Sequence, residues 1–138
     1  GGDNAFIADS WLENFSNWRA PVIGSWSESL CAAIDVAWQP GGPLLVKNNY
    51  ISAMCVGSVF IQDSNISAIP GPKRPHDVWI TNNEFIWPEE YRVGSPEHLA
   101  ASPRRMSSAR HHVEFKSCQR CVIEGNIFRS TWASVNQG

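Results

Sequence analysis

A short pattern that returns four times along the chain constrains the fold more than any other feature of the sequence. Each copy has a β-branched residue, a spacer, a small polar pair and then a pair that is mostly aromatic or aliphatic. The copies begin at Ile7, Val46, Ile80 and Ile123, so that successive starts lie 39, 34 and 43 residues apart. A period of this size is typical of proteins built as stacked arrays of one structural unit.

Each copy predicts a strand, a sharp turn and a second strand. The turn positions hold Asn, Gly, Asp and Ser, which tolerate left-handed backbone or hydrogen-bond to it locally. If the copies stack, their side-chain amides can bond to the copies above and below and satisfy turn backbone that no strand ladder reaches. The predicted polar column is Ser10, Asn49, Asn83 and Asn126, and the predicted apolar columns are Ile7, Val46, Ile80 and Ile123, and Leu12, Ile51, Phe85 and Phe128.

Alternating apolar and polar residues predict one further strand before three of the copies. The alternating segments are 33–37, 58–62 and 112–116, and a period of two is typical of a sheet with one buried face. Three strands per unit, wound in the same direction and stacked about 4.8 Å apart, make a parallel β-helix. The sequence therefore predicts an all-β fold, a single-stranded solenoid of about three to four coils with long loops.

Proline and glycine mark the loops between these strands. We expect long return loops at 16–32, 52–57 and 88–111. The segment 95–110 is rich in basic residues, Ala and Ser and holds two prolines, which predicts a mobile or protruding loop.

The length of 138 residues fits one domain, residues 1–138, or part of one. A net charge of −2 argues against a nucleic-acid partner, which needs a basic surface to neutralise phosphates. No apolar run reaches the roughly 18 residues of a membrane span. Because the first and last residues are Gly, we expect a longer protein, and a missing signal peptide then says nothing about export. Seven Trp predict some exposed aromatic surface, which tends to mark a binding face.

The chain has four cysteines, an even number that permits two disulfides without fixing their connectivity. They are Cys31, Cys55, Cys118 and Cys121. The spacing of Cys118 and Cys121 is that of half a zinc ribbon or of a redox pair, although no second such pair is present. The third alternative is small apolar residues at a turn, oxidised if the protein is secreted.

We expect no metal and no cofactor, since calcium would need several converging oxygens and Glu89 and Glu90 have no third carboxylate close in sequence.

Three of the repeated segments resemble the Asn-turn motif of the pectate-lyase-like family of right-handed parallel β-helices. These segments are Asn48–Ile51, Asn82–Phe85 and Gly125–Phe128. More closely, Gly42–Tyr50, Asn83–Phe85 and Glu114–Phe128 are similar to segments of bacterial proteins with right-handed β-helix repeats. The resemblance covers most of the chain. It implies a right-handed winding, polysaccharide as the partner, and a location that is extracellular, periplasmic or at the cell surface.

The same resemblance leaves the activity open, because this fold carries lyases, hydrolases, isomerases and non-catalytic scaffolds. The calcium-binding carboxylates and basic Arg of pectate lyases are not recognisable in this sequence. Polygalacturonases use Asn-Thr-Asp, Asp-Asp and Arg-Ile-Lys strings. The nearest string here is Thr81–Asn83, which lacks the Asp.

In this architecture a groove runs along the outer face of the first strand of each coil. By alternation, the residues facing outward there are Asp35, Phe60, Gln62, His112, Glu114 and Lys116. Asp35 and Glu114 would lie two coils, roughly 9–10 Å, apart, close to the about 6.5–9.5 Å between the carboxyls of inverting glycosidases. We therefore predict Asp35 and Glu114 as the candidate catalytic pair. The alternative is that both are ordinary solvated strand positions.

The predicted substrate-binding residues on this face are Phe60, Gln62, His112 and Lys116, joined by Arg104 and Arg105 of the long loop. Phe60 can stack on a sugar ring or lie under a loop. The two arginines can hold a uronate or sulfate group, or be solvated. His76 and Asp77 resemble part of a catalytic triad, but no Ser in a nucleophile elbow accompanies them.

Together with these candidate residues, the resemblance implies an extracellular β-helix protein that binds or degrades an acidic polysaccharide, as a lyase or a glycoside hydrolase. One alternative is a non-catalytic β-helix that binds glycan or serves as a surface scaffold. Another is a structural segment of a larger enzyme whose site lies elsewhere. The oligomeric state is left open by the sequence.

Overall fold

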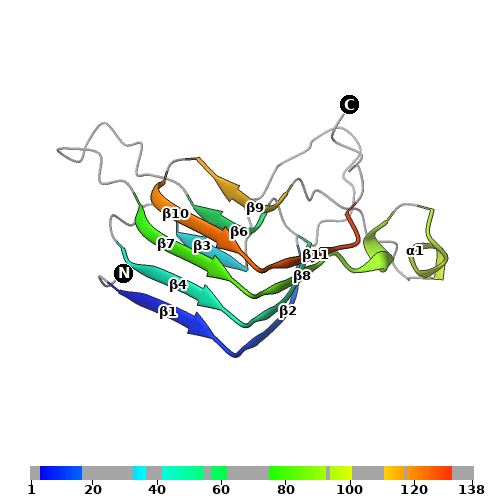
Figure 1. Ribbon diagram of the computed structural model, residues 1–138. Coiled ribbons are helices and arrows are strands. Elements are labelled where there is room, and N and C mark those ends of the chain that lie inside the picture. The colour runs from blue at the N-terminus through cyan, green and yellow to red at the C-terminus, as the bar shows by residue number, and fades with distance from the viewer. Residues whose placement is uncertain are drawn as a thin grey trace.

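The structure of the protein, a computed structural model, is built mostly of β-strands with little helix (Figure 1). Within the described residues the strands form three sheets, in which the strand pairings are parallel. This agrees with the all-β class predicted from the sequence. The described residues are 4–16, 33–36, 42–54, 57–61, 75–92, 94–100, 111–116 and 118–131.

Each sheet gathers strands from different copies of the repeat. Sheet A has the order β1 (Ala5–Ala8), β4 (Leu44–Lys47), β7 (His76–Thr81) and β10 (Gln119–Glu124). Sheet B has the order β11 (Ile127–Arg129), β8 (Glu84–Ile86), β5 (Tyr50–Met54) and β2 (Trp11–Ser16). Sheet C has the order β3 (Ile34–Val36), β6 (Gly57–Ile61) and β9 (His111–Phe115). Sheets A and B meet at the turn in the middle of each copy, where the chain bends sharply (Figure 1).

The strand registers align equivalent positions of the four copies. In sheet A, Val46 of β4 pairs with Ile7 of β1 and with Ile80 of β7, and Ile80 pairs with Ile123 of β10. In sheet B the aligned positions are Leu12, Ile51, Phe85 and Phe128. Both apolar columns predicted from the sequence are therefore confirmed.

The core lies between the sheets, where the inward columns face one another. The central members of both columns are fully buried, and sheet C adds Ile34, Val59 and Ile61 to the same cluster. Burial of side chains of this size contributes roughly 1.5–3 kcal/mol each. The columns therefore supply the main apolar driving force for stacking the copies.

The turn between sheets A and B has the same backbone in every copy. Its first residue is left-handed, with φ of 52° at Asp9, 56° at Asn48, 55° at Asn82 and 64° at Gly125. Asp, Asn and Gly adopt this conformation at the least cost, which explains why the sequence places them there. The polar column residue follows directly in each copy.

The amide of Asn83 is the best-connected member of the polar column. Its Oδ1 accepts hydrogen bonds from the backbone N of Asn49 (3.0 Å) and from Asn49 Nδ2 (2.9 Å). Its Nδ2 donates to the Val46 carbonyl (2.9 Å) and to Asn126 Oδ1 (2.9 Å). An amide has two donor hydrogens and two acceptor lone pairs. All four are used at this buried position.

The same pattern links the other copies. Asn49 Oδ1 accepts from the backbone N of Ser10 (3.1 Å), and Asn49 Nδ2 donates to the Ile7 carbonyl (3.0 Å). Asn126 Oδ1 accepts from the backbone N of Asn83 (2.9 Å). The structure thus brings all four predicted column residues together, and each amide satisfies backbone groups of the preceding copy.

The segment 95–110 differs in part from its prediction as a loop. It begins with a short helix, α1 (Pro96–Ala100), which follows the 3-10 helix η1 (Glu89–Tyr91) and projects away from the sheets (Figure 1). Ser95 caps α1, because its Oγ accepts a hydrogen bond from the backbone N of His98 (3.0 Å). Proline is also favoured at the first helical position. Ser95 and Pro96 therefore indicate the start of a helix, although the composition of the segment is typical of a loop.

Replacing Asn83 by Ala would leave the Asn49 N–H and the Val46 carbonyl without partners inside the protein. We expect Asn83→Ala to lower the free energy of unfolding by roughly 1–3 kcal/mol, measured by chemical denaturation. Asn82→Gly is the matched control. It removes the neighbouring exposed amide, keeps a residue that tolerates the left-handed backbone, and should cost less than about 1 kcal/mol. Equal losses in the two variants would contradict the role assigned to the Asn83 amide.

Candidate functional site

The strand register brings the two predicted catalytic carboxylates and the predicted aromatic residue into one row across sheet C. Asp35 of β3 pairs with Phe60 of β6, and Phe60 pairs with Glu114 of β9. Neighbouring strands lie about 4.8 Å apart, so the backbones of Asp35 and Glu114 are separated by roughly 9–10 Å. Asp35 and Phe60 are described through their backbone only. The strand register alone therefore defines this row. Glu114 is the member of the row whose side-chain contacts are described.

Glu114 is not a lone carboxylate on an open face. Its side chain is only 12% exposed, and its Oε1 forms an ion pair with Nζ of Lys116, another predicted substrate-binding residue. Its Oε2 is buried and has no hydrogen-bond partner among the described residues. Lys116 is itself exposed. A ligand that reaches this end of β9 would therefore meet the lysine and the carboxylate as a pair.

The expectation that His112 faces outward beside Glu114 is wrong. The side chain is 7% exposed, and its ring centroid lies 4.6 Å from that of Trp87, 5.6 Å from Phe128 and 6.1 Å from Phe85. These aromatic residues come from β8, β11 and the residue that follows β8, so sheet B and its continuation cover the start of β9. The alternation of residues along one strand does not indicate whether side chains of another sheet cover it.

Burial lowers the pKa of His112 from its ordinary value of 6.5 to about 4, because the imidazolium loses its hydration among apolar groups. The backbone of Arg129 opposes this shift. Neither ring nitrogen, however, reaches a well-aligned hydrogen-bond partner within the described part of the chain. His112 is therefore neutral at pH 7 and packs as part of the aromatic cluster rather than contacting a ligand on sheet C.

The remaining predicted ligand contacts are not described. Gln62, Arg104 and Arg105 lie outside the described residues, so their roles stay predictions. The polar column lies at the turn between sheets A and B rather than on sheet C. Its hydrogen bonds go to backbone groups of neighbouring copies and link the amides to one another.

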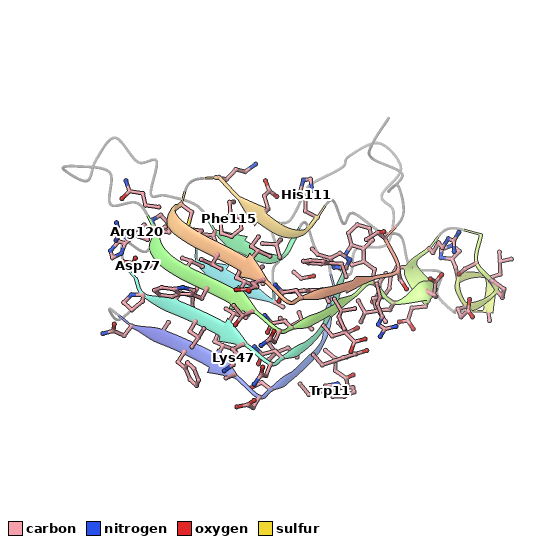
Figure 2. The ribbon with its side chains drawn as sticks, in the orientation of Figure 1. Trp11, Lys47, Asp77, His111, Phe115 and Arg120 are labelled. Atoms are coloured by element: carbon pink, nitrogen blue, oxygen red, sulfur yellow. A yellow bond between two sulfur atoms is a disulfide. The ribbon has the colours of Figure 1, made fainter. Side chains whose placement is uncertain are left out.

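A cluster of charged side chains lies at the start of β7 and β10, where Asp77 and Arg120 meet (Figure 2). Arg120 donates from Nε to Asp77 Oδ1 (2.5 Å) and from Nη2 to Asp77 Oδ2 (2.6 Å), and His76 Nδ1 lies 2.7 Å from the same Oδ2. Arg120, with help from His76, holds the pKa of Asp77 well below its usual range, and Asp77 raises the pKa of Arg120.

The backbone of this cluster is unusual as well. Asp77 and Arg120 both have a φ of 54°, which is uncommon for a residue as large as Arg and is a feature that concentrates at functional sites. The two residues are 43 apart, the same spacing as the third and fourth copies of the repeat. Their contact could therefore have been found by extending the alignment of the copies towards the N-terminus. The Arg120 guanidinium is already bound to Asp77, so it is not an unpaired cation. The contact with Asp77 instead orients the His76 ring.

Cys118 and Cys121 form a disulfide that brackets Gln119 and Arg120. Of the alternatives drawn from the sequence, this favours an oxidised pair over half a zinc site. Among the described residues, no three or more His, Cys, Asp or Glu side chains are grouped so that they could hold a metal ion. In the same part of the chain, no helix has the length and apolar character needed to cross a membrane.

No protein-family model matches the chain, and no similar curated protein or solved structure was found. The resemblance to pectate-lyase-like proteins therefore rests on the motif residues of this sequence.

The lowered pKa of His112 predicts how stability depends on pH. Between pH 6.5 and 4 the unfolded chain takes up a proton that the folded protein excludes, so the free energy of unfolding falls as the pH falls through this window. The full loss amounts to roughly 3 kcal/mol. His112→Phe keeps the packing on Trp87 and should remove most of this loss.

Urea denaturation of both proteins at a series of pH values between 7 and 4 measures the effect. Asp77, whose pKa is also lowered, contributes below about pH 4 and equally in both proteins. A wild-type protein whose stability is as flat as that of His112→Phe across the window would contradict a neutral, buried His112.

Proposed function

We propose that sheets A, B and C are the three faces of a right-handed parallel β-helix, and that its sheet C face binds an acidic polysaccharide. The winding is supported by the order in which the chain visits the sheets. From β3 to β11 it passes through sheets C, A and B in turn, three times over. Parallel strands of one sheet cannot be joined by a tight hairpin and need a crossover connection. The strands of the other two sheets provide that connection in each coil.

The binding face is supported above all by the row of Asp35, Phe60 and Glu114 in register across sheet C. Sugar rings have apolar faces and polar edges, and an aromatic position between two carboxylates can contact both kinds of surface. Lys116 adds a cation beside Glu114, which can bind the carboxylate of a uronate. On this proposal, Lys116 and the aromatic position of sheet C supply the contacts to an acidic glycan.

The catalytic form of the proposal assigns Asp35 and Glu114 as the two carboxyls of a glycoside hydrolase. Their separation of roughly 9–10 Å lies at the upper end of the about 6.5–9.5 Å found in inverting enzymes, which leaves room for a water molecule. The ion-paired Glu114 suits the base that activates this water, and Asp35 then acts as the acid that protonates the leaving oxygen.

A non-catalytic glycan-binding or structural scaffold is the second candidate. The burial of Glu114 favours it, because a carboxylate that is 12% exposed and paired with Lys116 has little access to a glycosidic oxygen. On this alternative the ion pair stabilises the strand face, and binding uses its exposed lysine and the aromatic position.

An oxidising compartment fits both candidates. A disulfide between Cys118 and Cys121 persists outside the cell, in the periplasm or at the cell surface and is rare in reducing cytosol. This supports the location that the family resemblance implies.

Polysaccharide binding and degradation assays on a panel of acidic and neutral glycans test the proposal. We expect the wild-type protein to bind an acidic glycan, and Glu114→Gln to reduce any turnover at least about 100-fold while circular dichroism and thermal melting stay unchanged. Glu124→Gln, at an exposed position on β10, is the matched control and should retain activity. Binding without turnover in both proteins would favour the scaffold. A wild-type protein that binds none of the glycans would overturn both candidates.

A further inference from the structure

The outer face of sheet A carries a row of apolar side chains. Alternate residues of β4 and β7 are buried in the core, so the residues between them point to the opposite face of the sheet. The strand register places one such apolar residue from each strand side by side. These residues, called the sheet A row below, are Phe6, Leu45, Trp79 and Val122.

The two central members of the row owe their exposure to the face of the sheet. β4 lies between β1 and β7, and β7 lies between β4 and β10, so Leu45 and Trp79 each have a described strand on both sides. Trp79 is nevertheless 37% exposed, and Leu45 is half-buried. An open strand edge therefore does not account for their exposure. Exposed apolar side chains that are contiguous on one face and rimmed by polar groups tend to mark a binding surface.

Polar side chains border the sheet A row on both sides. Two residues further along the strands, about 6.6 Å away, the register aligns Lys47, Thr81 and Glu124. Two residues earlier in β7 and β10 stand Asp77 and Arg120, which are ion-paired. Figure 2 shows this pair near the start of the strands of sheet A and Lys47 near the end of β4. The apolar row is therefore one residue wide, with hydrogen-bonding groups at both edges.

The charges beside the row balance. Lys47 and Arg120 are cations, and Asp77 and Glu124 are anions, so this face attracts neither acidic nor basic ligands overall. Arg120 binds Asp77 through Nε and Nη2, and a guanidinium has five donor hydrogens, which leaves others for a hydroxyl oxygen. These groups fit a ligand that is neutral and rich in hydroxyls.

A linear polysaccharide has the shape and the polarity of this surface. A sugar ring has apolar faces, formed by its C–H groups, and hydroxyls around its edge, so a ring that lies on an aromatic side chain directs its hydroxyls sideways. A protein partner fits less well, because a stable interface buries about 800 Å² on each side around an apolar core. A membrane surface fits less well too, since Asp77 and Glu124 would repel anionic headgroups.

We propose that the outer face of sheet A binds a neutral, extended polysaccharide. Its chain runs across the strands along the sheet A row, with sugar rings stacked on Trp79 and its neighbours. Its hydroxyl groups hydrogen-bond to the polar side chains at the two edges of the row. This surface is separate from sheet C, and the proposal does not depend on the acidic polysaccharide proposed to bind there.

Isothermal titration calorimetry with three hexasaccharides tests the proposal. Cellohexaose is neutral and extended, maltohexaose joins the same sugars in a curved chain, and hexagalacturonate is acidic. We expect the wild-type protein to bind cellohexaose with a Kd below about 1 mM, and at least about 10-fold more tightly than maltohexaose. Trp79→Ala should weaken cellohexaose binding at least about 10-fold, because the stacking surface is lost. It should leave any binding of hexagalacturonate unchanged.

Trp11→Ala is the matched control. It removes another exposed tryptophan, on β2 and outside the sheet A row, and should bind cellohexaose as tightly as the wild type. Circular dichroism checks that each variant is folded. Trp79→Thr, whose β-branched side chain suits a strand, replaces Trp79→Ala if the latter does not fold.

Four results would overturn the proposal. The first is a wild-type protein that does not bind cellohexaose at about 1 mM. The second is an equal loss of binding in Trp11→Ala and Trp79→Ala. The third is hexagalacturonate binding that Trp79→Ala abolishes, which would place an acidic glycan on the row. The fourth is self-association of the wild type, seen by sedimentation equilibrium and abolished by Trp79→Ala, which would place a second copy of the chain there.

Discussion

The need to satisfy buried amides at the turn between sheets A and B governs the rest of the structure. An Asn at this position is stable only if groups of the neighbouring copies occupy all its donor and acceptor positions, because an unpaired buried polar group costs about 1–3 kcal/mol. Asn83 meets this condition through Asn49, Val46 and Asn126. A shift of one copy by a single residue would break every one of these bonds. The amides therefore specify the register that also aligns the apolar columns.

The parts of the fold that were predictable are those that follow from this register. The period of the repeat was enough to place Ile7, Val46, Ile80 and Ile123 in one column, since equivalent residues of stacked copies lie above one another. It would also have been enough to find the contact of Asp77 with Arg120. Features that depend on contacts across the core were not predictable, and His112 is the main example. Its strand pattern indicated an exposed residue, whereas Trp87 and Phe128 bury it. A single strand does not contain that information.

Short-range signals explain a second difference between sequence and structure. Ser95 and the proline after it begin α1, although the composition around them is that of a loop.

The candidate site was predictable only as a row of positions. The register of Asp35, Phe60 and Glu114 follows from the alternation of their strands. The ion pair of Glu114 with Lys116 depends on side-chain conformation. It bears directly on whether the proposed site on sheet C would be catalytic or would only bind a ligand.

Amide hydrogen exchange at the turns tests the central role of the amide column most directly. The backbone N–H groups of Ser10, Asn49 and Asn83 each donate to an Asn Oδ1 of the following copy and can open only when the copies separate. The account predicts that these three amides, followed by NMR, exchange as slowly as those in the middle of β4 and β7. Exchange as fast as that of exposed loop amides would contradict it.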